Sequence, residues 1–263
     1  MNTKPVVLCF SGLDPTGGAG IQADIEAISA QHCHASSVVT ALTVQDTQNV
    51  HHFECVNTQL LLQQAHAVLR DMNINAIKIG MLGNAANAQA IHSLLLEYPQ
   101  IPVIIDPVLA AGGGGDLSST ALIDAINQLI LPHATITTPN TPEACKLAAC
   151  DKHSDESEII SKLSATGVTY ILLTGTHADT QDVQHHLYRG AKLLHSYFYK
   201  RLHNEYHGSG CTLAACLAAL IAKQIDVPEA VQLALDYTYS TLLYAHAAGK
   251  GQLIPNRFFQ EPK

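Results

Sequence analysis

The repeated alternation of short apolar runs with helical patterns constrains the fold of this chain more than any other feature. The apolar runs have the length and composition of buried strands and cover residues 6–11, 36–44, 76–80, 102–108, 134–138 and 170–174. Helical patterns lie between or after them at 21–30, 60–69, 85–96, 118–131 and 155–166. Strands that are connected through helices run parallel in one sheet. We therefore predict an α/β fold with a mainly parallel, doubly wound sheet flanked by helices, in a single domain over residues 1–263.

The pattern changes after residue 174. Two β-like runs, 184–188 and 193–199, are joined through Gly190, which favours a short antiparallel hairpin at the edge of the sheet. Two helical stretches follow, one ending at residue 222 and one over about 227–248, where Pro228 suits a first helical position.

Charge and cysteine usage exclude several classes of function. The net charge is −8 at pH 7 and no basic patch is evident, which argues against nucleic acid as the partner. The apolar runs near the N-terminus and at 213–222 are too short for a signal peptide or a membrane-spanning helix. The seven cysteines form no Cys-x-x-Cys pair and are typical of reduced thiols. We expect a cytoplasmic protein that binds neither nucleic acid nor a membrane.

A glycine-rich turn, Gly208-Ser209-Gly210-Cys211-Thr212, precedes the apolar helix that ends at residue 222. The free amides of residues 209 to 212 and the positive end of the helix dipole predict a site for a phosphate or oxyanion. The same position should lower the thiol pKa of Cys211 and make a thiolate accessible. Such a turn suits phosphoryl transfer. The alternative is an ordinary loop before a core helix, with Cys211 as a small buried hydrophobe.

Polar residues at the ends of other strands are further candidates. Gln45 can offer both a donor and an acceptor to a planar heterocycle, Asp106 ends a strand where α/β sheets bind ligands, and Glu143 lies near a helix start that Thr141 can cap. Each also suits an ordinary polar loop, turn or helix cap. Four glycines at 112–115 predict either a mobile flap over a ligand or a solvated loop.

Other patterns carry less weight. Residues 18–23 match the Gly-x-Gly-x-x-Ala dinucleotide fingerprint, but 13–17 separate them from the strand end, so we do not expect an NAD site. The chain has no Gly-x-x-x-x-Gly-Lys-Ser/Thr sequence. Neighbouring histidine pairs, such as His51 and His52, have no evident third ligand, so we expect no structural metal site.

Taken together, the motifs at 11–24, 40–47, 78–82, 106–108, 139–144 and 207–212 resemble the hydroxymethylpyrimidine/phosphomethylpyrimidine kinases of thiamine biosynthesis, in the ribokinase-like superfamily. The resemblance covers nearly the whole chain. It implies a homodimer that uses ATP and Mg²⁺ to phosphorylate first the hydroxymethyl group of 4-amino-5-hydroxymethyl-2-methylpyrimidine and then the resulting monophosphate.

The resemblance also implies roles for individual residues. On the substrate side it places Gln45 against the pyrimidine edge, with Gly12, Ala19, Asp24, Met81 and Val108 around the ring. Gly208, Ser209, Gly210 and Cys211 would form the anion hole, and Cys211 would replace the Asp base of most ribokinase relatives. Asn140, Thr174 and Thr212 would lie at the ATP phosphates, and Asp106 and Glu143 at Mg²⁺.

Two positions depart from the family pattern. Thr174 stands where many members carry a Lys, and the four-glycine stretch replaces a turn with Ser or Thr. A charge-assisted hydrogen bond contributes about 1.5–3 kcal/mol, so its absence would weaken ATP handling without abolishing transfer. The remaining alternatives are a pyridoxal kinase and a non-catalytic, pyrimidine-binding relative, which Thr174 alone favours.

Overall fold

A nine-stranded sheet forms the centre of the molecule in a computed structural model that describes residues 4–109, 118–151, 153–176 and 180–260. Its strand order is β3-β2-β1-β4-β5-β6-β7-β8-β9. The strands are β1 (Val6–Leu13), β2 (His34–Gln45), β3 (Val50–Cys55), β4 (Ile74–Ile79), β5 (Val103–Ile105), β6 (Ile136–Thr137), β7 (Tyr170–Thr174), β8 (Asp182–Arg189) and β9 (Lys192–Lys200). The helices are α1 (Gly20–Ala30), α2 (Thr58–Asp71), α3 (Ala85–Glu97), α4 (Thr120–Ala125), α5 (Thr141–Leu147), α6 (Glu156–Ser164), α7 (Ser209–Ala222) and α8 (Val227–Leu243).

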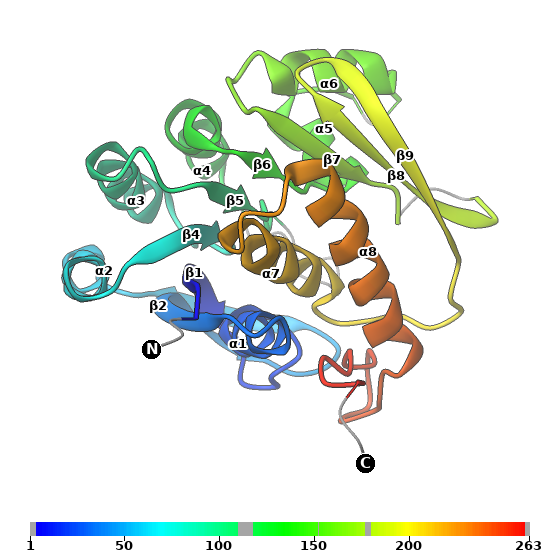
Figure 1. The fold of residues 1–263 in the computed structure, drawn as a ribbon, viewed down its shortest axis with the longest axis horizontal. Helices are drawn as coiled ribbons and strands as arrows, with labels where there is room; N and C mark the ends of the chain where they lie inside the picture. The colour runs from blue at the N-terminus through cyan, green and yellow to red at the C-terminus, as the bar shows by residue number, and fades with distance from the viewer. Residues whose placement is uncertain (1–3, 110–117, 152, 177–179, 261–263) are drawn as a thin grey trace.

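Six neighbouring strands of the sheet, β2, β1, β4, β5, β6 and β7, are parallel. Strand β3 at one edge and strands β8 and β9 at the other are antiparallel to their neighbours. This confirms the predicted α/β class with a mainly parallel sheet. Helices cover both faces (Figure 1): α1, α7 and α8 lie on one side and α2 to α6 on the other. Alternate strand residues supply the two cores, so that Phe10 packs with the α2–α6 layer and Cys9 with the α1, α7 and α8 layer.

Several sequence predictions were wrong in detail. Strand β3 was missed, because its residues are no more than half-buried and carry two histidines that we considered as a metal pair. The helix expected over 118–131 is divided into α4, a π-helical turn at Ile126–Ile130 and a 3₁₀ turn at Leu131–His133, where Pro132 cannot continue the helix. Helix α8 ends at Leu243 rather than near 248. The four-glycine stretch at 112–115, and with it the predicted flap, lies outside the described residues.

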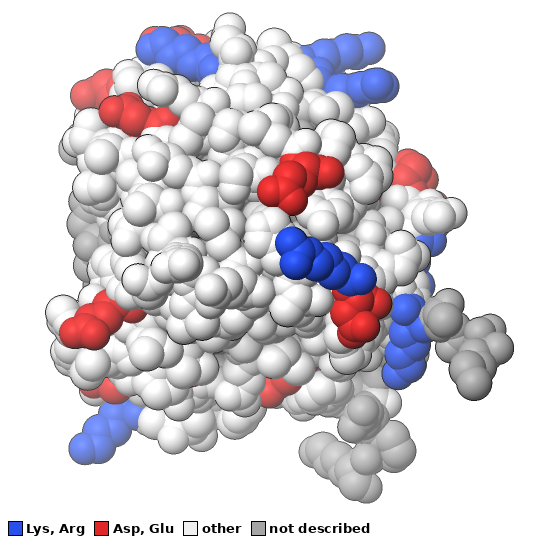
Figure 2. All heavy atoms as spheres, turned by 90° about the vertical axis from the view of Figure 1, so that its left-hand side faces the viewer, with Lys and Arg blue, Asp and Glu red and all other residues white. Residues whose placement is uncertain are grey.

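The surface and the helices bear on the expected partners. On the face that Figure 2 shows, Lys and Arg side chains are scattered among Asp and Glu and form no continuous basic patch. Within the described ranges, no helix has both the length and the apolar character needed to cross a membrane. All seven cysteines are free.

Candidate active site

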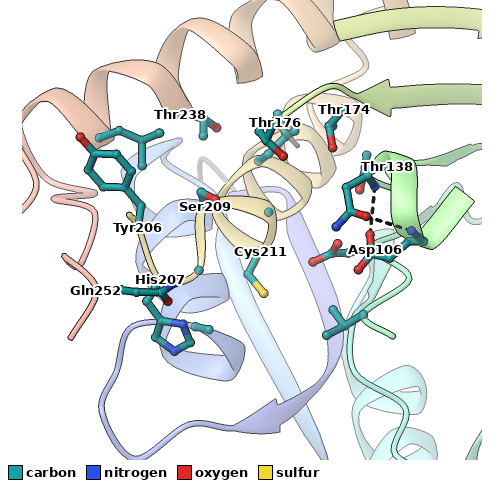
Figure 3. Close-up of a pocket in the computed structure, with 18 of the residues that line it drawn as sticks. Asp106, Thr138, Thr174, Thr176, Tyr206, His207, Ser209, Cys211, Thr238 and Gln252 are labelled. Carbon is teal, nitrogen blue, oxygen red and sulfur yellow. Dashed lines mark hydrogen bonds between the residues drawn. The ribbon is translucent and has the colours of Figure 1, made fainter. Parts of the chain in front are cut away.

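A cavity of about 820 Å³ opens at the carboxyl ends of the parallel strands. Strand β1 has β2 on one side and β4 on the other, so the chain reverses its direction of winding at β1, and open α/β sheets bind ligands at such a position. The cavity extends from Gln45 and Met81 to Thr174 and the residues of α8. Figure 3 shows Cys211 at the start of α7, with His207 on one side and Asp106 on the other.

The glycine turn in which the sequence predicts an anion site, here called the anion turn, lies at the start of α7 (Ser209–Ala222). Gly208 has φ 79°, and a Cβ there would lie 2.0 Å from the Gly18 carbonyl oxygen, so only glycine fits. The next residues, Ser209, Gly210 and Cys211, line the cavity. First-turn amides have no acceptor within their own helix, so this turn offers backbone donors and the positive helix end to an anion.

Thr212 does not face the cavity, although the resemblance implied that it lies at the ATP phosphates. Its amide and its hydroxyl both donate to the Gly208 carbonyl oxygen, at 2.9 and 2.8 Å, and the residue is fully buried. Arg257, from the C-terminal segment, donates to the Thr212 hydroxyl at 3.0 Å and also binds the Gly18 carbonyl oxygen. The expectation of a free Thr212 amide was wrong, because this residue supports the turn from behind.

The pKa of the Cys211 thiol is raised, contrary to the lowered pKa that the sequence predicts. Burial and the neighbouring Asp106 carboxylate raise its pKa to about 12 and outweigh Lys78 and the Gly20 amide, which act in the opposite direction. A helix N-terminus lowers a thiol pKa only where desolvation is modest.

Lys78 supplies a buried positive charge that the sequence analysis did not assign. Its ammonium lies 2.9 Å from Asp24 Oδ1 and 3.2 Å from the Ser11 hydroxyl, and both ionic side chains are fully buried. Asp24 was expected to contact substrate, but it is not part of the cavity wall and instead forms an ion pair with Lys78, whose side chain does line the cavity. The signal in the sequence was a lysine within the apolar run 76–80, since a buried lysine requires a partner.

Asp106 and Glu143 lie close enough for their carboxylates to interact. Burial and the neighbouring Asp106 raise the pKa of Glu143 to about 8, and burial raises the pKa of Asp106. Asp106 Oδ2 is buried without a hydrogen-bond donor among the described residues. Glu143 and Asn140 form a capping box at α5, so Asn140 is the cap in place of the expected Thr141. Two buried carboxylates with an unmet oxygen fit a hard cation such as Mg²⁺, which binds through one or two carboxylates together with phosphates.

Other predicted residues are also on the cavity wall. Gly12, Ala19, Met81 and Val108 line one end together with Gln45. At the other end the Thr174 hydroxyl donates to the Pro139 carbonyl oxygen at 3.3 Å, and Thr174 forms a parallel β-bridge with Asn140.

Basic side chains also line the cavity, namely Lys146, Lys200 and Arg201. Basic side chains therefore supplement the backbone amides of the anion turn in this cavity.

The sequence analysis did not assign Asp14 and His207, which lie at the end of the cavity that Gln45 lines, here called the ring end. Nε2 of His207 lies 2.8 Å from Asp14 Oδ2 and 2.7 Å from the side-chain amide of Gln45. Both residues belong to motifs that the sequence analysis quoted, but neither spacing nor residue type shows that the chain brings positions 14, 45 and 207 together.

The fold and the cavity define a class of protein: an α/β kinase of the ribokinase-like type, in which a glycine turn at a helix start faces carboxylates across the site. Residues 14–256 match the family model described as phosphomethylpyrimidine kinase, and the chain belongs to this family.

Comparisons with individual proteins agree. The chain is 31% identical over 265 residues to a hydroxymethylpyrimidine/phosphomethylpyrimidine kinase of Staphylococcus aureus, covering 97% of this chain and 94% of the relative. It is 34% identical over 247 residues to the thiamine biosynthesis bifunctional protein ThiED of Geobacter sulfurreducens, covering 93% of this chain but only 50% of the relative. The chain thus spans about half the length of that relative.

Solved structures share the fold. A phosphomethylpyrimidine kinase of Clostridium difficile has 29% identity and a TM-score of 0.79, with 91% of this chain and 100% of that chain covered. A Bacillus subtilis pyridoxal kinase in complex with ADP has a TM-score of 0.88 at 24% identity, with 97% and 98% covered. At that identity the second likeness supports the fold only.

Proposed function

We propose that this chain phosphorylates 4-amino-5-hydroxymethyl-2-methylpyrimidine with ATP and then phosphorylates the monophosphate to the diphosphate, in thiamine diphosphate biosynthesis. The observation that carries the proposal is that one cavity holds both the Gln45 amide beside an apolar slot and the anion turn with Cys211. The names of the family and of the relatives that the chain spans nearly in full support the same activity.

The residues of the ring end bind and orient the acceptor. Gly12, Ala19, Met81 and Val108 enclose a flat ring, and the Gln45 amide hydrogen-bonds to its edge. This arrangement directs the hydroxymethyl group toward Cys211. Fixing the hydroxyl against the donor phosphate lowers the entropy cost of the reaction.

The anion turn stabilises the charge of the group in transfer. The amides of Ser209, Gly210 and Cys211 point to the phosphate, and the Lys78 ammonium adds positive potential from below. Cys211 enters the reaction as a thiol, so it donates a hydrogen bond or orients the hydroxyl rather than removing its proton. Phosphoryl transfer through a loose transition state makes little demand on a base.

Asp106 would hold Mg²⁺ with help from Glu143, while Asn140 and Thr174 lie toward the phosphates of ATP. When bound, Mg²⁺ neutralises phosphate charge and orients the transferred group. Asp106 Oδ2 would then gain the partner that it lacks among the described residues.

We also propose that the whole chain acts as one kinase domain, forms a homodimer and works in the cytoplasm. The exposed Leu13, Leu42 and Val44 lie on β1 and β2 near the β3 edge and suit a contact with a second copy. The seven free cysteines support a reducing compartment. Sedimentation of the purified protein tests the dimer.

Substrate-dependent ADP release tests the activity. The purified protein is mixed with Mg²⁺, ATP and either hydroxymethylpyrimidine or pyridoxal at equal concentrations. The proposal predicts a higher kcat/KM with hydroxymethylpyrimidine. A preference for pyridoxal would instead make the chain a pyridoxal kinase, and pyrimidine binding without ADP release would make it a non-catalytic relative.

A further inference from the structure

The contacts of Asp14, Gln45 and His207 determine how many hydrogens lie between them. The Asp14 carboxylate is buried and accepts from the Thr16 amide at Oδ1 and from the Ala19 amide at Oδ2, both at 2.8 Å. Burial alone would raise the pKa of Asp14, but these bonds and the one from His207 lower it. Asp14 is therefore an acceptor only.

It follows that Nε2 of His207 carries a hydrogen. This nitrogen lies 2.8 Å from Asp14 Oδ2, and a bare nitrogen facing an ionised carboxylate at that distance would be repelled. The conclusion holds whether the ring is neutral or protonated at both nitrogens. Gly18 allows the ring to sit here, because a Cβ at that position would lie 2.2 Å from a carbon of the His207 ring.

The hydrogen on His207 decides the orientation of the Gln45 amide. One end of that amide lies 2.7 Å from His207 Nε2, and the two ends are alike in shape, so hydrogen-bond accounting identifies them. An amide nitrogen facing an N–H would leave two donors in contact. The end toward His207 is therefore the oxygen, which accepts a share of the Nε2 hydrogen.

The contacts of Thr43 at the other end of the Gln45 amide support the same orientation. Its hydroxyl donates to the Leu13 carbonyl oxygen at 2.9 Å and lies 3.3 Å from the Gln45 amide end remote from His207. A hydroxyl has one hydrogen, so with that hydrogen on Leu13 its oxygen is free to accept from an amide N–H. Both neighbours of Gln45 thus select the same orientation.

The geometry points to Asp14 and His207 as positioning residues that lock the Gln45 amide with its oxygen toward His207, so that the cavity selects a ring edge with an amino donor beside a nitrogen acceptor. The matching oxo ring presents a carbonyl where the amino group would be and an N–H where the ring nitrogen would be. Against a locked amide both contacts become repulsive. This inference rests on the proposed function for the identity of the ring.

The first test is a ratio of two catalytic efficiencies. We would measure kcat/KM for hydroxymethylpyrimidine and for its 4-oxo analogue with the wild-type protein and with His207→Phe, which keeps a flat ring beside Gly18 but has no N–H. We expect the wild type to prefer the amino ring and His207→Phe to reduce that preference about ten- to hundredfold, the range that one mismatched buried polar group produces. A general loss of activity with an unchanged ratio would overturn the inference.

The chain offers a matched control. His51 Nε2 lies 2.9 Å from Asp46 Oδ2 on the same β2–β3 hairpin, but both side chains are about half exposed and neither lines the cavity. His51→Phe therefore makes the same change at a similar pair, and we expect the ratio to stay at the wild-type value. A fall equal to that of His207→Phe would contradict a role for the cavity pair.

A second measurement does not depend on a folded variant or on turnover. Nitrogen-15 NMR of the wild-type protein distinguishes a protonated from a bare Nε2 in His207, with the ring signal assigned through its correlation to the backbone resonances of residue 207. We expect a protonated Nε2, and a bare nitrogen would overturn the lock. If the wild type phosphorylates neither pyrimidine, the proposed function fails, while this measurement still decides the orientation of Gln45.

Discussion

The ammonium of Lys78 lies 2.9 Å from Asp24 Oδ1, and both side chains are fully buried next to the cavity. The Lys78 charge lowers the pKa values of both Asp106 and Cys211, against the stronger effect of burial on each. The pair therefore links the interior of the sheet to the carboxylate and the thiol of the site.

We predict that substitutions of Lys78 and Asp24 change the free energy of unfolding and the turnover independently of each other. Lys78→Met leaves the buried Asp24 carboxylate without its counter-ion, which costs about 3–5 kcal/mol in the free energy of unfolding. Lys78→Met combined with Asp24→Leu removes both charges and should recover most of that loss in a urea denaturation. Its turnover should stay low, because the positive potential near the anion turn is gone. Recovery of both stability and turnover would show that the pair is structural only.

Cys211→Ala should lower kcat more than it weakens pyrimidine binding. The thiol lies at the reacting end of the cavity, whereas the ring contacts come from other residues. A hydrogen bond to a charged group contributes about 1.5–3 kcal/mol, so loss of the thiol donor should lower kcat about ten- to hundredfold. Calorimetric titration with the pyrimidine and steady-state kinetics measure the two effects, and wild-type turnover would remove Cys211 from the chemistry.

Gly208→Ala should disrupt the anion turn, because a Cβ at residue 208 would meet the Gly18 carbonyl oxygen. Gly190→Ala is the matched control: Gly190 also has a positive φ, 56°, but its added Cβ would approach nothing closer than 3.5 Å. Both variants carry the backbone strain of about 1 kcal/mol for a non-glycine residue at positive φ. Only Gly208→Ala should lose activity as well, and equal kinetics for the two variants would contradict the importance of the turn.

His185 gives a prediction about pH. This residue on β8 lines the cavity, and burial followed by the neighbouring His186 lowers its pKa to about 4. In the unfolded chain the histidine has its ordinary pKa of about 6.5, so the unfolded state holds more protons between these two pKa values and stability falls as the pH decreases from about 6.5 to 4. This pKa shift of His185 corresponds to a decrease on the order of 3 kcal/mol in the free energy of unfolding. In urea titrations His185→Gln should show a smaller acid loss than the wild type, and identical pH profiles would refute the assignment.

The sequence was sufficient for the fold wherever local pattern and tertiary structure agree. The parallel strands were predictable because each is a short apolar run that lies between helical patterns. Strand β3 was not, because it is an edge strand whose partly exposed side chains alternate weakly. The end of α8 was also misplaced, since apolar residues continue beyond Leu243 into a segment that turns back.

Within the site, the residues at strand ends could be found from the chain alone, and their electrostatics could not. The Cys211 pKa depends on burial and on Asp106, which is 105 positions away in the chain. Asp24 and Thr212 lie in the right motifs, but they face the protein interior, and a motif does not reveal which way a side chain points. Lys78 lies in an apolar run that predicts a buried strand, and this local pattern does not show that its charge lies at the site.

The most direct test of the account follows the phosphorylated products over time. The protein is incubated with hydroxymethylpyrimidine, Mg²⁺ and excess ATP, and the mixture is separated by ion-exchange chromatography at intervals. We expect a monophosphate to appear first and then to be converted to the diphosphate, with one ADP released for each phosphate added. If neither product forms while the protein is folded and binds ATP, the central claim is wrong.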